Sequence, residues 1–208
     1  MNFNFSNKNV LVTGSSRGIG RAIARQFAAS GARVVIHCHK NREAAEQTVA
    51  ELPGGPHLLV QADVSDPASV HGMVDTALNA MDRIHVLVNN AGIFEEYQMV
   101  ELTYGQWQKQ WERTIRTNLL GPANISFCFI RHMIKEGGGK IVNLSSRGAF
   151  RGEPDAPDYG ASKAGLNSLS QSMASSEARV SNFKCSMCLR WNRKLFYRKK
   201  ELDIHFAF

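Results

Sequence analysis

The stretch Lys8–Gly20, KNVLVTGSSRGIG, decides the fold. Its first part, KNVLVT, is a short β-branched apolar run, which is typical of a buried strand. The run stops at a turn with glycines at positions 14, 18 and 20, and residues 21–30 then carry apolar side chains at helical spacing before Gly31. A strand, a glycine-rich turn and a helix are therefore predicted in that order.

The same alternation continues along the chain. Further strands are expected at residues 33–37, 57–62, 84–89 and 140–144, and further helices at 43–52, 67–81, 106–135, with an interruption near Gly121-Pro122, and 159 to about 173. Strands this apolar, separated by helices, indicate a parallel sheet that is covered on both faces. The expected fold class is α/β, a doubly wound parallel sheet of the Rossmann-like type.

Composition narrows the class of protein. The 208 residues contain no apolar run of the roughly 18 residues that a membrane span requires, and Met1 to Lys8 has no signal-peptide pattern, so we expect a cytoplasmic protein. The cysteines, at positions 38, 128, 185 and 188, are too few and too scattered for a disulfide framework. Reduced thiols are the simpler expectation.

The positive charge is concentrated at the C-terminal end. Of the formal net charge of +7, residues 175–208 contribute +5 and residues 1–174 only +2. We expect the basic cluster Arg198-Lys199-Lys200 to be a solvated terminus rather than a contact to nucleic acid or membrane. Cys185 and Cys188 form a single CxxC without a second pair, so no metal is expected.

The glycine-rich turn can bind phosphate. Glycines between a strand and a helix allow the backbone to approach a pyrophosphate, and the free N–H groups of the helix N-terminus supply partial positive charge. This predicts that a dinucleotide contacts the residues of the turn, namely Gly14, Ser16, Arg17, Gly18, Ile19 and Gly20. The alternative is a plain glycine-rich turn without a ligand.

Residues 37–42, HCHKNR, indicate which dinucleotide is bound. A cofactor with a free 2′-hydroxyl usually meets an Asp or Glu about 20 residues after the glycines, and this segment has neither. Lys40, Arg42 and, in the first turn, Arg17 would favour a 2′-phosphate instead. NADP is therefore the predicted cofactor and NAD the second choice. The alternative is that Lys40 and Arg42 are solvated residues at the start of a helix.

Small and polar residues follow two further strands. Asp63 and Val64 come after the third expected strand, and Asn90, Ala91 and Gly92 come after the fourth. Such residues are common in turns. In doubly wound sheets, however, ligands bind outside the carboxyl ends of the strands, so their shared position predicts contacts to the cofactor.

The segment YGASK places Tyr159 and Lys163 four residues apart on one helical face, and Ser146 ends the fifth strand. Lowering the pKa of a tyrosine from about 10 by three units requires about 4 kcal/mol. One positive charge at about 4 Å supplies that amount if the effective dielectric constant is near 20. Lys163 is thus expected to lower the pKa of Tyr159. The alternative is an exposed Tyr/Lys pair on an amphipathic helix.

Together these motifs resemble the short-chain dehydrogenase/reductase family over roughly residues 8–174. The matching motifs are TGxxxGxG at Thr13–Gly20, Asp63-Val64, NNAG at Asn89–Gly92, the family's asparagine at Asn118, its serine at Ser146, and YxxxK at Tyr159 and Lys163. The basic end of the second strand and the helix start at residues 43–46 look most like NADP-linked 3-oxoacyl-carrier-protein reductases.

The resemblance implies an NAD(P)-dependent oxidoreductase that transfers a hydride between a nicotinamide and a carbonyl or alcohol group of a small molecule. Tyr159 would donate a proton to the carbonyl oxygen and Ser146 would orient that oxygen. Lys163 would hold the nicotinamide ribose, and Asn118 would hold a water that connects the lysine to solvent. A homodimer or homotetramer through residues 106–135 and 159–173 is also implied.

The resemblance ends after about residue 174. The family continues with a sixth apolar strand that ends in a Pro-Gly turn, a substrate loop and a seventh strand, whereas residues 175–208 contain neither proline nor glycine. We therefore expect a dinucleotide-binding domain at residues 1–178, a divergent basic tail at 179–208, and a sheet without its sixth and seventh strands. The alternative function is a catalytically inactive dinucleotide-binding or interaction protein.

Overall fold

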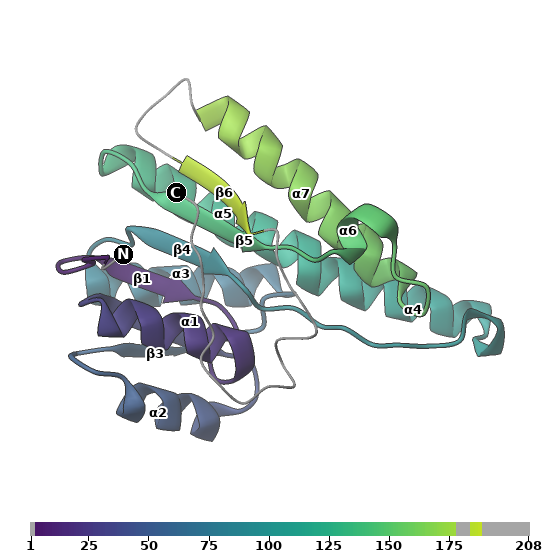
Figure 1. The fold of residues 1–208 in the computed structure, drawn as a ribbon, viewed down its shortest axis with the longest axis horizontal. Coiled ribbons are helices and arrows are strands. Elements are labelled where there is room, and N and C mark those ends of the chain that lie inside the picture. The colour runs from purple at the N-terminus through teal and green to yellow at the C-terminus, as the bar shows by residue number, and fades with distance from the viewer. Residues whose placement is uncertain (1–2, 178–183, 189–208) are drawn as a thin grey trace.

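In the computed structural model, which describes residues 3–177 and 184–188, six parallel strands form one sheet in the order β3-β2-β1-β4-β5-β6 (Figure 1). The strands are β1 (Asn9–Val12), β2 (Arg33–Cys38), β3 (Leu58–Gln61), β4 (Val86–Asn89), β5 (Lys140–Leu144) and β6 (Lys184–Cys188). This strand order is that of a doubly wound Rossmann-like sheet. The predicted α/β class is confirmed.

The helices are α1 (Gly18–Ala29), α2 (Arg42–Glu51), α3 (Pro67–Met81), α4 (Tyr104–Ile115), α5 (Gly121–Lys135), α6 (Gly148–Arg151) and α7 (Pro157–Glu177), with a 3-10 turn η1 (Met99–Glu101) and a π-helical segment η2 (Arg116–Leu120). Three of the described helices, α2, α3 and α4, begin at a residue whose side chain caps them. The side chain of Asn41 accepts the N–H of Ala44, and Thr103 and Gln106 form a capping box.

Alternating side chains of the strands form a core on each face of the sheet. Val10 and Val12 of β1 pack with α1 and α2 on one face, whereas Leu11 packs with α3 and α5 on the other. Because successive residues of a strand point to opposite faces, a strand with two buried faces needs an unbroken apolar run. This is the run that the sequence carries between Lys8 and Thr13.

The sixth strand corrects the expectation that the sheet lacks one. β6 runs parallel to β5, with Lys184 opposite Lys140 and Cys188 opposite Leu144. Pairing of backbone groups does not require an apolar pattern, so KCSMC gave no recognisable strand signal. The sheet therefore extends past residue 178, into the segment assigned to the tail. The basic cluster at 198–200 lies outside the described residues.

The long helical region is continuous where an interruption was expected. α4 passes through η2 into α5, and the change of helix type falls at residues 116–120, just before Gly121-Pro122. Pro122 lies in the first turn of α5, where its missing N–H is tolerated. A Cβ on Gly121 would lie 2.7 Å from the carbonyl oxygen of Val64, so a glycine is required for this close approach.

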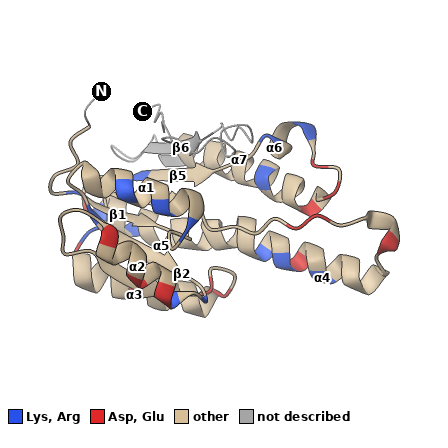
Figure 2. Cartoon of the chain, turned by 60° about the horizontal axis from the view of Figure 1, so that its bottom comes forward, with Lys and Arg blue, Asp and Glu red and all other residues tan. Residues whose placement is uncertain are grey.

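Charges of both signs are spread over the helices and loops in the view of Figure 2, and both occur along α4. At the end of α4, Arg116 lies 3.0 Å from Glu112. Within the described ranges, no helix is both long and apolar enough to cross a bilayer. Cys38 and Cys128 are free thiols.

His85 connects β4 to the start of β1. Its Nδ1 accepts the backbone N–H of Asn9 at 3.0 Å, so this nitrogen carries no proton. Burial of the ring, together with the charges of Arg83 and Lys8, lowers the pKa of His85 to about 4. The folded state therefore favours the neutral imidazole.

We predict that the free energy of unfolding decreases as the pH falls from about 6.5 toward 4. In this window the unfolded chain, with a His85 pKa of 6.5, takes up a proton that the folded chain does not. His85→Asn, which keeps an acceptor, should flatten this dependence in urea unfolding measured at several pH values. His71→Asn, on the exposed face of α3, is the control. Equal slopes for His85→Asn and wild type would contradict the prediction.

Candidate active site

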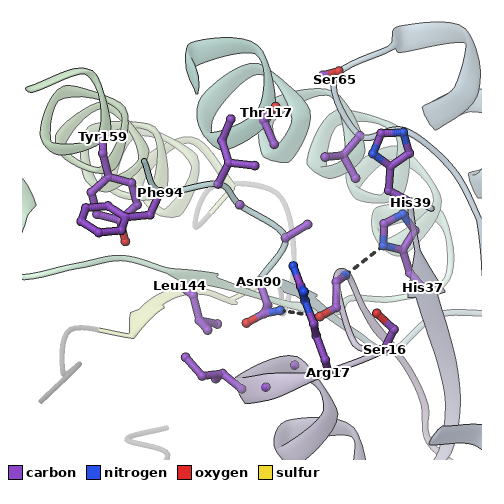
Figure 3. A pocket seen from close by; sticks show the side chains of 18 of the residues that line it. Ser16, Arg17, His37, His39, Ser65, Asn90, Phe94, Thr117, Leu144 and Tyr159 are labelled. Carbon is purple, nitrogen blue, oxygen red and sulfur yellow. Dashed lines mark hydrogen bonds between the residues drawn. The ribbon is translucent and has the colours of Figure 1, made fainter. Parts of the chain in front are cut away.

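A cavity of about 1240 Å³ lies at the carboxyl ends of the strands (Figure 3). It is centred where the strand order reverses between β1 and β4, the usual ligand site of doubly wound sheets. All but two of the predicted site residues line it, namely Gly14, Ser16, Arg17, Gly18, Ile19, Gly20, Lys40, Asp63, Val64, Asn90, Ala91, Gly92, Ser146, Tyr159 and Lys163. The exceptions are Asn118, which is fully buried behind the wall, and Arg42, which is exposed at the start of α2.

Hydrogen bonds between Thr13 and Asn90 join the two loops at the centre of the cavity. The hydroxyl of Thr13 accepts the backbone N–H groups of Asn90 and Ala91, at 3.0 and 2.9 Å. In return the Asn90 amide donates to the carbonyl oxygens of Thr13 and Gly14, at 2.8 and 3.1 Å (Figure 3). The turn after β1 and the loop after β4 therefore form one unit.

The glycines of the turn keep this unit tightly packed. Gly14 has a φ of +64°, and a Cβ on Gly20 would lie 2.3 Å from the carbonyl oxygen of Gly14. Arg17, the residue that precedes α1, makes no side-chain cap, and the first turn of α1 contains no acidic residue. The N–H groups at this helix start are thus available to an anion, and the turn fits the pyrophosphate of a dinucleotide.

The basic segment after β2 divides into two parts. Lys40 lines the cavity, as does Arg17 from the first turn. Arg42, in contrast, begins α2 and donates from Nε to Glu46 at 2.8 Å on the exposed face of that helix. The contribution of Arg42 to the cofactor site stays a prediction.

Tyr159 is half-buried in the cavity wall near the start of α7. The pKa of its hydroxyl lies above the usual value, mainly because the group is buried. A hydrogen bond with the Ser146 side chain lowers this pKa, and the charge of Glu153 raises it. The expectation that Lys163 lowers this pKa is wrong for the present arrangement. The Lys163 Nζ lies 5.8 Å from the centroid of the Tyr159 ring and donates to the carbonyl oxygen of Leu144 at 2.8 Å.

Lys163 is buried, and its ammonium group is hydrogen-bonded to the end of β5. Burial lowers its pKa to about 8, so at pH 7 it is still mostly protonated. The Leu144 carbonyl that it contacts ends β5, next to Ser145 and Ser146. The strand end thus holds the ammonium group on the same side of the cavity as the tyrosine.

Asn118 acts through the segment that follows β4. Its Oδ1 accepts the backbone N–H of Ile93 and its Nδ2 donates to the carbonyl oxygen of Ile93, both at 2.8 Å. It lies in the π-helical segment η2, and π-helical turns are frequent at functional sites. Its side chain therefore shapes the cavity wall, and its role in holding a water stays a prediction.

Buried amides and hydroxyls fix α7 against the sheet. Asn89 of β4 donates to Ser126 of α5 (3.0 Å) and to Asn143 of β5 (2.8 Å). Asn143 in turn donates to Ser170 of α7 at 2.8 Å. Because these buried groups stabilise the fold only when paired, they determine the position of the helix that carries Tyr159 and Lys163.

Among the cavity-lining residues that sequence reasoning did not assign are His37, Ile93, Phe94 and Leu144. Phe94 packs edge-on against the Tyr159 ring, with the ring centroids 4.8 Å apart (Figure 3). Ile93 and Leu144 contribute through their backbones, which no side-chain motif reports. The ring of His37 bonds the glycine-rich turn. Only His37 had a signal, its position at the end of a strand next to the expected cofactor segment.

Comparison with known proteins identifies the family of the chain. The family model for short chain dehydrogenases matches residues 8–188, which includes β6. The chain therefore belongs to the short-chain dehydrogenase family of oxidoreductases.

Several similar proteins align with most of the chain. An uncharacterised oxidoreductase from Thermotoga maritima is 37% identical over 94% of this chain and 75% of its own length. A 3-oxoacyl-[acyl-carrier-protein] reductase from Synechocystis is 36% identical (79% and 66%), and one from Chlamydia trachomatis is 37% identical (84% and 71%). A crystal structure described as a proposed short-chain alcohol dehydrogenase from Sinorhizobium meliloti has a TM-score of 0.80 at 30% identity, over 90% of this chain and 73% of its own.

We predict that Thr13→Val lowers the free energy of unfolding by about 1–3 kcal/mol, because it leaves the N–H groups of Asn90 and Ala91 without their acceptor. Urea unfolding measures the change. Thr13→Ser keeps the hydroxyl and should lose less. If both variants were equally stable, the hydroxyl would not be the group that joins the two loops.

Proposed function

We propose that this protein transfers a hydride between NADP and the carbonyl or alcohol group of a small molecule, with NAD as the second choice of cofactor. The observation that carries the proposal is that Ser146, Tyr159 and Lys163 line the same cavity as the glycine-rich turn. Groups suited to bind a dinucleotide and groups suited to move a proton thus face one space. Membership of the short-chain dehydrogenase family supports the same reaction class.

The protonation states of the site suit a reduction. When bound, the reduced nicotinamide supplies the hydride that adds to the carbonyl carbon. The Tyr159 hydroxyl, whose raised pKa keeps it protonated at neutral pH, donates the proton to the carbonyl oxygen. Ser146 hydrogen-bonds that oxygen and orients it. The mostly protonated Lys163 stabilises the negative charge left on the tyrosine.

We expect Tyr159→Phe to lower turnover at least about 100-fold, because the phenylalanine has no proton to donate. The affinity for NADPH, measured by its fluorescence, should change little. Turnover is followed as NADPH oxidation with a panel of ketones and 3-oxoacyl thioesters, which the names of two relatives suggest as first substrates. Tyr104→Phe, at an exposed residue of α4, is the control.

The outcomes separate two functions. Appreciable turnover by Tyr159→Phe would remove this tyrosine from its assigned role. Binding of NADPH by wild type without turnover on any substrate of the panel would favour the catalytically inactive dinucleotide-binding protein instead.

The preference for NADP depends on the charges beside the turn. Arg17 and Lys40 line the cavity, and the lining residues at 37–41 include no carboxylate. Asp63, on the neighbouring strand end, lies 3.5 Å from His39. A 2′-phosphate would therefore meet two basic side chains.

We predict that the double variant Arg17→Ala/Lys40→Ala raises the Kd for NADPH about tenfold or more, while the Kd for NADH changes less than threefold. Fluorescence titration of both cofactors measures the two constants. Arg25→Ala is the matched control, since Arg25 pairs with Glu51 and is not among the residues that line the cavity. A wild-type protein that bound NADH tenfold more tightly than NADPH would show the charge argument to be wrong.

Self-association is the second part of the proposal. The helices expected to form a dimer or tetramer carry large exposed apolar side chains, among them Leu120 at 48% and Phe127 at 64% exposure. Burying such side chains against a second copy would be favourable.

A further inference from the structure

The buried ring of His37 connects two strand ends at the cavity. This residue of β2 is 1% exposed and lines the cavity beside the glycine-rich turn (Figure 3). Its Nδ1 accepts the backbone N–H of Gly14 at 2.9 Å, and its Nε2 lies 3.1 Å from the carbonyl oxygen of Ala62, after β3. Since a carbonyl only accepts, the proton is on Nε2, and Nδ1 is free to accept.

The imidazole must be neutral to make both contacts. Burial is the main cause that lowers the pKa of His37 to about 4; His39 on the same segment lowers it, while the Ala62 carbonyl and Asp63 raise it. At neutral pH the Nδ1 lone pair is therefore available. A proton on Nδ1 would face the Gly14 N–H, which is also a donor.

Backbone hydrogen bonds between His37 and Ser15 add to the contacts that the His37 ring makes with the turn. Its N–H donates to the hydroxyl of Ser15 at 2.9 Å, and its carbonyl oxygen accepts the N–H of Ser15 at 3.0 Å. Gly14 is thus held from two sides, by His37 at its N–H and by the Asn90 amide at its carbonyl oxygen (Figure 3). With its positive φ, Gly14 lies outside any regular ladder that could hold it otherwise.

We infer that His37 is a positioning residue for dinucleotide binding: its neutral ring holds Gly14, and with it the glycine-rich turn, in the shape that receives the pyrophosphate. The inference rests on the proposed function, because the ligand of the turn is the dinucleotide. His37 itself acts through Gly14 and needs no contact with the ligand.

The experiment compares variants that keep or remove the acceptor. His37→Asn places its amide oxygen near the position of Nδ1 and keeps the bond to Gly14. His37→Gln reaches the Nε2 position and loses it, and His37→Leu removes both contacts. We expect the Kd for NADPH, from fluorescence titration at pH 7.5, to stay within threefold of wild type for His37→Asn and to rise at least tenfold for His37→Gln and His37→Leu.

His57→Leu is the matched control. The Nδ1 of His57 also accepts a backbone N–H, that of Val34 at 3.1 Å, but at the opposite end of β2 and outside the cavity. This variant should lower stability in urea without changing the Kd for NADPH. A general structural effect of removing a histidine acceptor would instead change the Kd in both places.

The outcomes distinguish the inference from the proposed function. If wild type binds NADPH and both His37→Gln and His37→Asn bind it equally well, the inference is overturned and the proposed function stands. Equal weakening in His37→Gln and His37→Asn would also overturn it, because the acceptor would then not be the relevant group. If wild type binds neither NADPH nor NADH, the proposed function fails, and the inference with it. Should His37→Leu not fold, the comparison of the two amide variants decides.

Discussion

The structure depends on the hydrogen bonds that join Thr13 to Asn90 across the centre of the sheet. They link the carboxyl ends of β1 and β4, where the strand order reverses and the helices leave toward opposite faces. The cavity lies at this reversal of the strand order, where Gly14 from the turn after β1 and Asn90 from the loop after β4 both line it. The glycines allow the turn after β1 to pack this closely, because a Cβ on Gly20 would collide with Gly14.

A second polar system carries the proton-transfer groups. Asn89, Asn143 and Ser170 connect β4, β5 and α7 through the core, so α7 cannot slide along the sheet without leaving buried amides unpaired. This network therefore sets the positions of Tyr159 and Lys163, which both lie in α7. Their protonation states follow from burial, which raises the pKa of the tyrosine and lowers that of the lysine.

Histidines recur in the structure as hydrogen-bond acceptors for the backbone. His37, His57 and His85 each accept a backbone N–H through Nδ1, at a strand end or in the residue just before a strand. Backbone N–H groups at these places lack a partner in the strand ladder, and an imidazole nitrogen accepts them instead. Among these three residues, only His37 lines the cavity. The bonds of His57 and His85 therefore have a structural role, whereas that of His37 also has a proposed role in ligand binding.

Local pattern by itself determined most of the fold: α3 at Pro67–Met81 and β5 at Lys140–Leu144 have the predicted bounds, because periodicity and caps are properties of neighbouring residues. The positions of most site residues on the cavity followed from motifs at strand ends. Tertiary structure alone decided two matters: the pairing of β6, whose strand character comes from β5, and the raised pKa of Tyr159. Each depends on burial or on a partner distant in sequence, neither of which a local pattern contains.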